Sequence, residues 1–460
     1  MNPFLSKAFA PVRVENELSE VAIVGSWPAD INGTLYRIGP NPQFTPIEPY
    51  NPLMGDGMVH AFRITGGTVS YRSRWVRTRQ WKLENEAGRA LFSTSGDPRR
   101  HDPSVAGMQT DGAANTSLVW HAGRLLALEE GHLPIQIDPV TLETRGVWNF
   151  GGRLRNNMTA HPKIDPESGE MIFFANEPAR RFTGEIAWYV ANRQGHIVLE
   201  RPVQAPFPSV LHDFAVTRQF VVFIVCPVTV SITRTMAGGP PLAWEPQLST
   251  HVGVVRRDGS GGVLWLEKDA SFVWHVLNAW NEGNRITLDL CEQTAPAFPL
   301  PDGSPTAEAD WRQRYVRWEL DPALRNHVQT TRMSEQVCEY PRMDERYAMR
   351  ATRHGYFACH GGPGTGELFH RGLAHFDQAE RRMRSYGPLQ GCAVSEPVFV
   401  PRPQSVREGD GWLLCIIHDE NTDRGQLAVF DAQHVAHGPI ARAQLPWRVP
   451  MGFHGTWVAA

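Results

Sequence analysis

The sequence predicts an all-β protein whose many short sheets are arranged as a β-propeller. Apolar residues at helical spacing are scarce, whereas short strand patterns bounded by glycine, proline and aspartate turns recur along all 460 residues. No proline- or serine-rich linker divides the chain, so we expect one domain over residues 1–460. A unit of this size exceeds a simple sandwich, and radial repetition of sheets accommodates it. The sequence has no strict internal repeat of the kinds that mark other propellers.

The predicted strands pair as hairpins around short turns, from the first part of the chain to the last. Residues His60–Ile64 and Val69–Val76 flank the turn Thr65–Thr68, which contains two glycines. Further predicted strands, each next to a turn, lie at 135–137, 142–147, 172–174, 187–190, 196–199, 413–417 and 427–430. Such turns account for the 41 glycines and 36 prolines of the chain.

The apolar segments are too short to cross a bilayer as helices. The longest run, Phe220–Ile232, is interrupted by Pro227 and is shorter than the roughly 20 residues of a spanning helix, so it predicts a buried strand. The N-terminal residues contain no apolar stretch of signal-peptide length. The six cysteines are widely spaced without a C-x-x-C pair, which predicts reduced, buried thiols in a cytoplasmic protein.

Charge and motifs exclude several classes of function. The formal net charge is −3, and no run of lysine or arginine offers a footprint for nucleic acid. Basic charge is carried mostly by arginine, because the chain has only four lysines, which are Lys7, Lys82, Lys163 and Lys268. Walker A, G-x-S-x-G and H-E-x-x-H motifs are absent. The glycine-rich stretch His360–Gly366 lacks the spacing of a nucleotide-binding motif and predicts a loop.

Two stretches lack strand patterning and predict long loops. They are Arg234–Gln247 and Gln293–Ala309. Loops of this length often cover a functional site, and they also occur as tolerated insertions. From the sequence both interpretations stay open.

Four of the 18 histidines lie among apolar or aromatic residues at predicted ends of strands, namely His161, His212, His275 and His454. A single histidine of this kind is more often a core residue than a ligand. Their separations fit no helical motif, but they suit separate blades that each direct one imidazole toward a common axis. The pair His418 and Glu420 offers a different iron site of two histidines and one carboxylate, or simply the polar end of a hairpin.

With their surroundings, the four histidine segments resemble those of the carotenoid cleavage oxygenase family. The similarity runs along essentially the whole chain, through Asn32–Arg37, Gly55–His60, Asn115–Pro134, Glu339–Arg342 and Ser395–Pro397. It implies a seven-bladed propeller with a loop or helix cap over a metal site. It also implies that Fe(2+) is held by the imidazoles of His161, His212, His275 and His454. The resemblance assigns three glutamates to orient these imidazoles, namely Glu130, Glu339 and Glu396.

The resemblance further implies a non-heme iron dioxygenase that cleaves a conjugated C=C bond with O2 to two carbonyl products. By themselves, neutral imidazoles suit Fe, Zn, Cu or Ni. The expected partners are O2 and an apolar conjugated small molecule, with the chain a monomer or dimer and peripheral contact with a membrane left open. The alternatives are a carotenoid- or apocarotenoid-cleaving dioxygenase, a zinc-dependent hydrolase, and a propeller that only binds its ligand.

Within that family the sequence resembles the bacterial and fungal branch that acts on aryl alkenes such as stilbenes and isoeugenol. This similarity is carried by Ala87–Phe92, Asp102–Val105 and Asn278–Trp280, among others. Members that cleave 4-hydroxystilbenes bind the phenol with a tyrosine and a lysine, and the matching positions here are Ser95 and Glu129. Because a carboxylate repels a phenolate, we expect an aryl alkene that binds in another way, or a more apolar polyene.

Overall fold

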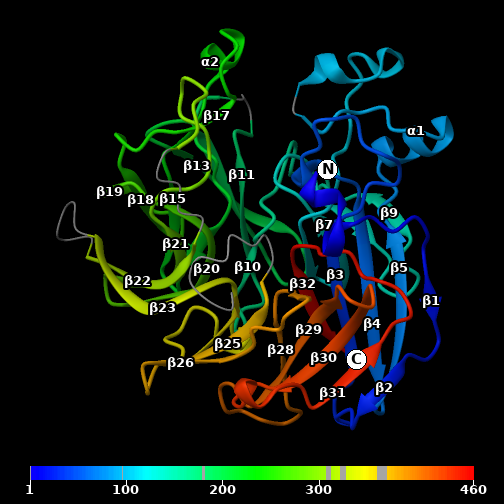
Figure 1. The fold of residues 1–460 in the computed structure, drawn as a ribbon. Coiled ribbons are helices and arrows are strands. Elements are labelled where there is room, and N and C mark those ends of the chain that lie inside the picture. Colours follow the sequence, from blue (N-terminus) through cyan, green and yellow to red (C-terminus); the bar gives the residue numbers. More distant parts are fainter. Residues whose placement is uncertain (1, 96, 179–181, 307–311, 322–327, 360–369) are drawn as a thin grey trace. The chain divides into compact units, whose positions relative to one another are not determined.

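The computed structural model describes residues 1–460 except 1, 96, 179–181, 307–311, 322–327 and 360–369. The predicted glycine-rich loop His360–Gly366 therefore lies outside the described residues. The described chain consists mainly of antiparallel sheets joined by loops and short helices (Figure 1). It falls into two compact units. Unit 1 comprises Met1–Ala160, Glu367–Leu373 and Tyr386–Ala460, and unit 2 comprises His161–Gly366 and Ala374–Ser385. That the whole chain forms one domain stays a prediction.

The described residues of unit 1 form three antiparallel sheets. The first has the order β1 (Glu17–Leu18), β5 (Thr68–Trp75), β4 (Gly57–Thr65), β3 (Gly33–Pro40) and β32 (Gly455–Ala459). The second has the order β6 (Ser117–His121), β7 (Arg124–Leu128), β8 (Ile135–Ile137) and β9 (Thr144–Val147). The third has the order β2 (Ala22–Gly25), β31 (Ala441–Gln444), β30 (Arg424–Asp431) and β29 (Gly411–Asp419), and β29 also pairs with β27 (Cys392–Val394) and β28 (Val398–Pro401).

Unit 2 contains two four-stranded sheets, one hairpin and most of a seven-stranded sheet among its described residues. The first four-stranded sheet has the order β10 (Lys163–Ile164), β11 (Met171–Asn176), β12 (Glu185–Ala191) and β13 (Ile197–Gln204). The second has the order β14 (Phe214–Val216), β15 (Phe220–Val225), β18 (Thr250–Arg256) and β19 (Leu264–Lys268). The hairpin pairs β16 (Val228–Val230) with β17 (Leu242–Trp244). The large sheet runs β20 (Phe272–Glu282), β21 (Arg285–Gln293), β22 (Arg314–Leu320), β23 (Val328–Arg342), β24 (His354–Cys359), β25 (Gly372–Asp377) and β26 (Arg382–Tyr386).

Helices are short and lie in the connections between sheets. The α-helices are α1 (Arg79–Ala87) and α2 (Ile232–Met236). Thr78 caps α1 by accepting the N–H of Trp81, and Gly88 ends it in the left-handed conformation at φ 67°. The 3₁₀ turns are Pro3–Leu5, Lys7–Phe9, Pro52–Met54, Pro98–Arg100, Pro103–Val105, Glu345–Tyr347 and Val435–His437. Among the described residues, no helix has both the length and the apolar character needed to cross a bilayer.

The hairpins predicted from the sequence are confirmed. Strands β4 and β5 pair through Thr65 and Thr68, as the glycine turn between them predicts. The other predicted strands are found as β8, β9, β11, β12, β13, β29 and β30. The prediction of one strand over Phe220–Ile232 is wrong in its extent: β15 ends at Val225 and β16 begins at Val228. Pro227 explains the break, because it has no N–H to donate to a sheet.

The first of the two predicted long loops is partly ordered into regular structure. Arg234–Gln247 contains most of α2 and all of β17, so its prediction as an irregular loop is wrong there. The described part of Gln293–Ala309 is irregular, as predicted, once β21 has ended. The two stretches contact each other, because the Trp244 N–H donates to the Pro299 carbonyl at 2.8 Å.

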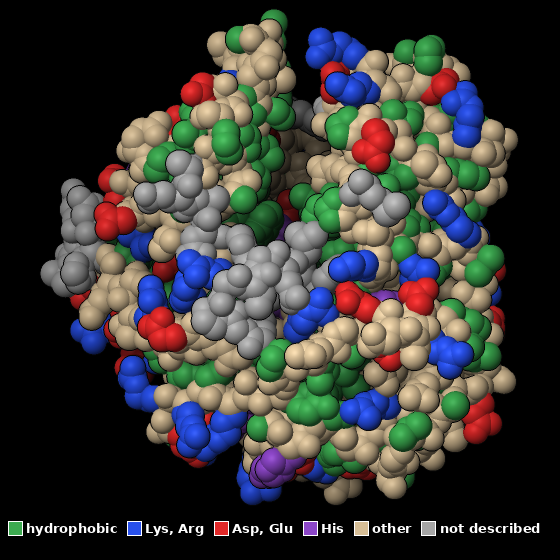
Figure 2. Space-filling model, in the orientation of Figure 1, with side chains coloured by type: hydrophobic (Ala, Val, Ile, Leu, Met, Phe, Trp, Pro, Cys, Tyr) green, Lys and Arg blue, Asp and Glu red, His purple; other side chains and the backbone are tan. Residues whose placement is uncertain are grey.

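Each unit buries its own apolar clusters between the sheets. In unit 2, Val222, Leu288 and Trp318 are fully buried in one cluster, and in unit 1 Phe62 and Leu414 are fully buried in another. A side chain of this size contributes about 1.5–3 kcal/mol when fully buried. All six cysteines are free thiols, five of them buried, as the sequence predicts. On the face drawn in Figure 2, charged side chains of both signs are interspersed with apolar ones, in agreement with the small net charge.

Candidate metal centre

Three of the four predicted ligands lie in unit 2, each near the start of the first strand of a sheet. His161 comes two residues before β10, His212 comes two residues before β14, and His275 lies within β20. Strands β10, β14 and β20 each stand at one end of the strand order of their sheet. Three sheets thus supply one imidazole each, two from the residues before the end strand and one from within it.

The three imidazoles converge through the same ring nitrogen. The Nε2 atoms of His161 and His212 are 3.0 Å apart, and those of His212 and His275 are 3.1 Å apart. The possible ligand nitrogens of all three lie within 4.8 Å of one another. A neutral imidazole has one N–H and one lone pair, so three converging Nε2 atoms are not all satisfied by hydrogen bonds to each other. Converging imidazole lone pairs are instead the donor set of a transition-metal ion.

A β-bulge includes His275 within strand β20. The pairing of β20 with β21 shifts register between Val273 and Val276, so that two residues of β20 stand opposite one residue of β21. Bulges bend a strand and re-aim a side chain, and they are frequent next to functional sites. The prediction that His275 lies at the end of a strand is therefore wrong: it lies inside β20, and its buried ring is next to those of His161 and His212.

Glu339 fixes the ring of His275. Its Oε2 is 2.7 Å from His275 Nδ1, and both side chains are buried. Because the carboxylate accepts, the imidazole proton lies on Nδ1 and the lone pair on Nε2. The ring of Tyr340 stacks on that of His275, with centroids 5.5 Å apart and an interplanar angle of 26°. Tyr340 adopts φ 52°, in the left-handed region, beside a register shift between β23 and β24.

In unit 1, Glu396 holds His454 in the same way. Glu396 Oε1 is 2.9 Å from His454 Nδ1, and Oε2 accepts the N–H of Gly455 at 2.8 Å. Glu396 lies in the short connection between β27 and β28, and His454 directly precedes β32. Both side chains are buried, so the contact is shielded from water. The carboxylate again places the imidazole proton on Nδ1 and the lone pair on Nε2.

The remaining predicted positions lie in unit 1. Glu130 is half-buried just after β7, and its role beside a ligand imidazole stays a prediction. Glu129, which the family resemblance matches to a phenol-binding lysine, contacts neighbouring residues of its own chain. It accepts the N–H groups of Ala113 and Ala114, the second at 2.9 Å, and it contacts His132. The Ser95 hydroxyl is 2.9 Å from that of Ser93.

Aromatic side chains connect the histidines of unit 2 to the irregular segment after β21. The Trp274 ring lies edge-to-face with that of His212, at 4.9 Å between centroids. The centroid of the Phe298 ring lies 6.3 Å from that of Trp274 and 5.5 Å from that of Phe272. The second predicted loop therefore reaches the histidine cluster of its own unit, which favours the cap interpretation over an insertion.

The alternative iron site at His418 is not formed by the described residues. His418 is buried at the end of the β29–β30 hairpin, where burial lowers its pKa, and its Nε2 is 3.6 Å from Asp423. No group of three metal-binding side chains includes it in the described part of the chain. The polar end of a hairpin, the other interpretation, is what the structure shows.

The sequence also left one buried histidine pair undetected. His354 Nδ1 lies 2.9 Å from His375 Nε2, and burial lowers the pKa of His375 to about 3. Both residues occupy strand interiors, β24 and β25, and no local motif distinguishes them from core positions. At neutral pH the pair is uncharged and forms part of the core.

Comparisons with known proteins agree with these features. A sequence profile of the family described as retinal pigment epithelial membrane protein matches residues 9–459. The chain is 35% identical to isoeugenol monooxygenase of Pseudomonas nitroreducens, over 99% of this chain and 98% of that protein. It is also 35% identical to resveratrol cleavage oxygenase 1 of Aspergillus fumigatus, over 99% of this chain and 95% of that protein.

A solved structure shows the same fold. The crystal structure of Pseudomonas brassicacearum lignostilbene dioxygenase matches with a TM-score of 0.94 and 33% identity, covering 100% of this chain and 99% of that one. This similarity confirms the all-β propeller class predicted from the sequence. The number of seven blades stays a prediction.

Proposed function

The chain belongs to the retinal pigment epithelial membrane protein family, which includes the carotenoid cleavage oxygenases, and we propose that it cleaves a conjugated C=C bond of an aryl alkene with O2. The products are two carbonyl compounds, one from each end of the cleaved bond. Relatives named for isoeugenol, resveratrol and lignostilbene support an aryl alkene of the stilbene or phenylpropenoid class. The observation that carries the proposal is the convergence of histidine Nε2 atoms in unit 2.

We propose that His161, His212, His275 and His454 together hold one Fe(2+) ion. Imidazole nitrogen is a suitable ligand for iron, and neutral ligands leave the full charge of the ion at the site. When bound, Fe(2+) supplies the one-electron chemistry with O2 that amino-acid side chains lack. His454 is assigned to the set because Glu396 holds it as Glu339 holds His275, with Nε2 as the ligand atom.

The protein's own groups prepare the site for an apolar substrate. Glu339 and Glu396 each keep a proton on Nδ1 of a ligand imidazole, which fixes the tautomer. Trp274 and Phe298 provide apolar ring surface beside the histidines of unit 2, which excludes water and favours a conjugated molecule. The contacts of Glu129 with Ala113, Ala114 and His132 support a binding mode that uses no cation at that position.

Metal analysis and a substrate panel test the proposal. The full chain, loaded with Fe(2+), is offered resveratrol, isoeugenol and an apocarotenal, and aldehyde products are identified by mass. We expect one iron per chain and cleavage of an aryl alkene. Preferred cleavage of the apocarotenal selects the carotenoid alternative. Fast cleavage of resveratrol contradicts the expectation that the Glu129 carboxylate disfavours 4-hydroxystilbenes. Bound zinc, or no cleavage of any of the three, overturns the proposed activity.

Single substitutions test the ligand set. His161→Ala, His212→Ala, His275→Ala and His454→Ala are each expected to abolish iron binding or turnover. His434→Ala is the matched control, because His434 is exposed and its Nδ1 lies 2.9 Å from Asp431 Oδ1, away from the four predicted ligands in the sequence. A variant that keeps full iron content and activity removes its residue from the ligand set.

A further inference from the structure

The side chain of Asp213 contacts all three segments that carry the histidines of unit 2. Asp213 directly follows His212, and its side chain is 2% exposed. Its Oδ1 is 2.7 Å from Nζ of Lys163, which lies two residues after His161. Its Oδ2 accepts the N–H of Val276 at 2.8 Å, and Val276 directly follows His275. One carboxylate thus contacts the backbone next to His275 and a side chain close to His161, from the segment of His212.

The bulge in β20 explains why Val276 needs this acceptor. Register shifts flank Val276 on both sides in the pairing of β20 with β21, so the regular ladder is interrupted there. A buried N–H without an acceptor is unfavourable, because it loses its hydrogen bond to water and gains none in the protein. Asp213 supplies the acceptor from a neighbouring sheet, and this bond holds the segment beside His275 against the segment of His212.

Lys163 makes the buried carboxylate tolerable. Transferring an unpaired carboxylate into a protein interior is strongly unfavourable, whereas a close ammonium group offsets much of that cost. The Lys163 ammonium also lies 5.9 Å from the centroid of the Phe214 ring. In a chain whose basic residues are nearly all arginine, one of only four lysines occupies this position.

We propose that Asp213 is a positioning residue that sets the distances among His161, His212 and His275, with Lys163 as its counter-ion. The inference deepens the proposed metal site: it requires that the three histidines bind a metal ion, but it requires no particular substrate. One contact is with the backbone N–H of Val276, next to His275, and the other is with the side chain of Lys163, two residues after His161, so loss of the carboxylate removes a link from the His212 segment to each of the other two. Groups that bind a ligand imidazole directly typically contribute 10- to 100-fold to metal affinity. Asp213 acts on the neighbouring segments instead, so we expect an effect near the lower end of that range.

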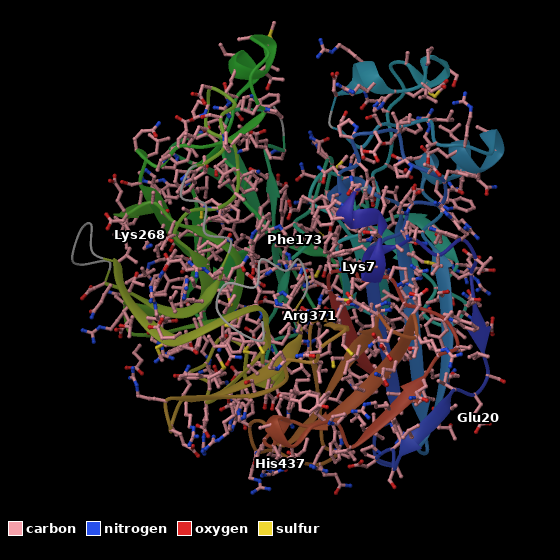
Figure 3. The ribbon with its side chains drawn as sticks, viewed as in Figure 1. Lys7, Glu20, Phe173, Lys268, Arg371 and His437 are labelled. Atoms are coloured by element: carbon pink, nitrogen blue, oxygen red, sulfur yellow. The ribbon has the colours of Figure 1, made fainter. Side chains whose placement is uncertain are left out.

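A second lysine–carboxylate pair in the same unit provides a matched control. Lys268 Nζ is 2.5 Å from Glu292 Oε1, and these side chains are 11% and 10% exposed. Lys268 also donates to Ser271 and lies 4.6 Å from the centroid of the Trp318 ring. Lys268, which is labelled in Figure 3, ends β19, and its contacts with Glu292, Ser271 and Trp318 involve none of the three histidines. Loss of this pair therefore reports the general cost of breaking a buried ion pair in unit 2.

The test compares Asp213→Asn, Lys163→Met, Lys163→Arg and Lys268→Met in the full chain. Cobalt(II) is the probe, because its visible absorption reports ligand geometry and its titration gives affinity without turnover. We expect Asp213→Asn and Lys163→Met to weaken Co(2+) binding about 10-fold or more and to change the visible spectrum. Lys163→Arg, which keeps the charge, is expected to restore the spectrum. Lys268→Met is expected to lower the unfolding temperature and to leave affinity and spectrum unchanged.

Several outcomes overturn the proposal. Folded Asp213→Asn protein with the affinity and spectrum of the parent chain removes the positioning role. Equal spectral changes in Lys163→Met and Lys268→Met show that only general stability is at stake. If Asp213→Asn does not fold, the two Lys163 variants decide alone by the same criteria. A parent chain that binds no Co(2+) or Fe(2+) refutes both the metal site and this inference, whereas metal binding without alkene cleavage refutes only the proposed reaction.

Discussion

At the scale of single residues, the orientation of each ligand imidazole depends on the group bound to its other nitrogen. Glu339 and Glu396 are both buried and both contact Nδ1 of a histidine. A carboxylate there raises the basicity of the imidazole and prevents the ring from rotating. Because the charge and the geometry act together, a neutral side chain of the same size separates the two effects.

Glu339→Gln is expected to lower metal affinity about 10- to 100-fold while the fold is retained. The amide oxygen still accepts the Nδ1 proton, but the negative charge that strengthens the imidazole as a ligand is lost. Iron content after dialysis against a chelator measures the effect, and circular dichroism checks the fold. Glu335→Gln is the control, since the Glu335 side chain is 78% exposed on the same strand. Equal iron retention in the two variants contradicts the role of Glu339.

Glu129→Lys is expected to destabilise the chain without improving the cleavage of 4-hydroxystilbenes. The substitution removes the acceptor for the Ala113 and Ala114 N–H groups and the partner of His132. An ideal Cβ on Gly112 would lie 2.3 Å from Glu129 Oε1, so the surrounding loop is packed closely on this carboxylate. We expect a loss of about 1–3 kcal/mol in the free energy of unfolding. Urea unfolding and resveratrol turnover measure it, and faster turnover in the variant would show that the lysine alone restores phenol binding.

At the scale of elements, the sequence predicts strands better than it predicts their irregularities. The hairpin of β4 and β5 follows from alternating apolar residues around two glycines. The bulge at His275 has no such signal, because it arises from the pairing of β20 with β21. Proline at position 227 was visible in the sequence, and it splits the apolar run into β15 and β16.

The candidate site was predictable to a similar extent. The four histidines share apolar or aromatic surroundings, but their assignment as ligands, and that of the three glutamates, came from the family resemblance. The pairing of Glu339 with His275 and of Glu396 with His454 is seen only in the structure. The contacts of Asp213 could not be predicted, since its partners Lys163 and Val276 lie on segments about 50 and 60 residues away along the chain. Long-range contacts of this kind depend on how complete sheets pack.

Two buried carboxylates, Asp56 just before β4 and Glu84 in helix α1, make the stability of the chain depend on pH. Burial and the nearby Glu84 carboxylate raise the pKa of Asp56 to about 7, from 3.8 in an exposed site. Burial also raises the pKa of Glu84. The pKa of Tyr50 is raised too, mainly by burial and to a smaller extent by the negative charge of Asp56. Since the folded state holds the Asp56 proton more tightly, the stabilisation is complete below pH 3.8 and is lost as pH rises through 7.

Asp56→Asn is therefore expected to gain stability relative to the parent chain as pH increases. The amide keeps an oxygen for the Gln43 N–H, which Asp56 accepts at 3.0 Å, and it carries no charge to bury. We expect the difference in the free energy of unfolding to grow by about 2–3 kcal/mol between pH 5 and pH 8. Urea unfolding at both pH values measures it. A difference that does not change with pH shows that Asp56 does not titrate in this range.

At the scale of the whole molecule, the first and last parts of the chain share one sheet. Strand β32 pairs with β3 over Gly33–Arg37, so residues more than 400 positions apart form neighbouring strands of unit 1. The segment before β32 is also held closely, since the Arg37 guanidinium donates to the Gly452 carbonyl at 2.8 Å. This closure fixes His454, which lies between the two contacts.

Removal of residues 454–460 is expected to abolish metal binding and to destabilise unit 1. The truncated chain loses His454 and leaves the edge of β3 without its partner β32, which exposes backbone groups and favours aggregation.

Because misfolding alone would explain loss of metal binding in the truncated chain, Gly452→Ala is the sharper variant. An added Cβ would lie 2.5 Å from the Ile38 carbonyl oxygen, so the substitution displaces the segment that leads to His454. We expect Gly452→Ala to keep its β circular-dichroism signal and to lose iron affinity. Gly66→Ala is the control, since nothing lies within 4 Å of its Cβ position, although its φ of 57° also strains alanine. Full iron content in Gly452→Ala would show that the closure of this sheet does not position His454.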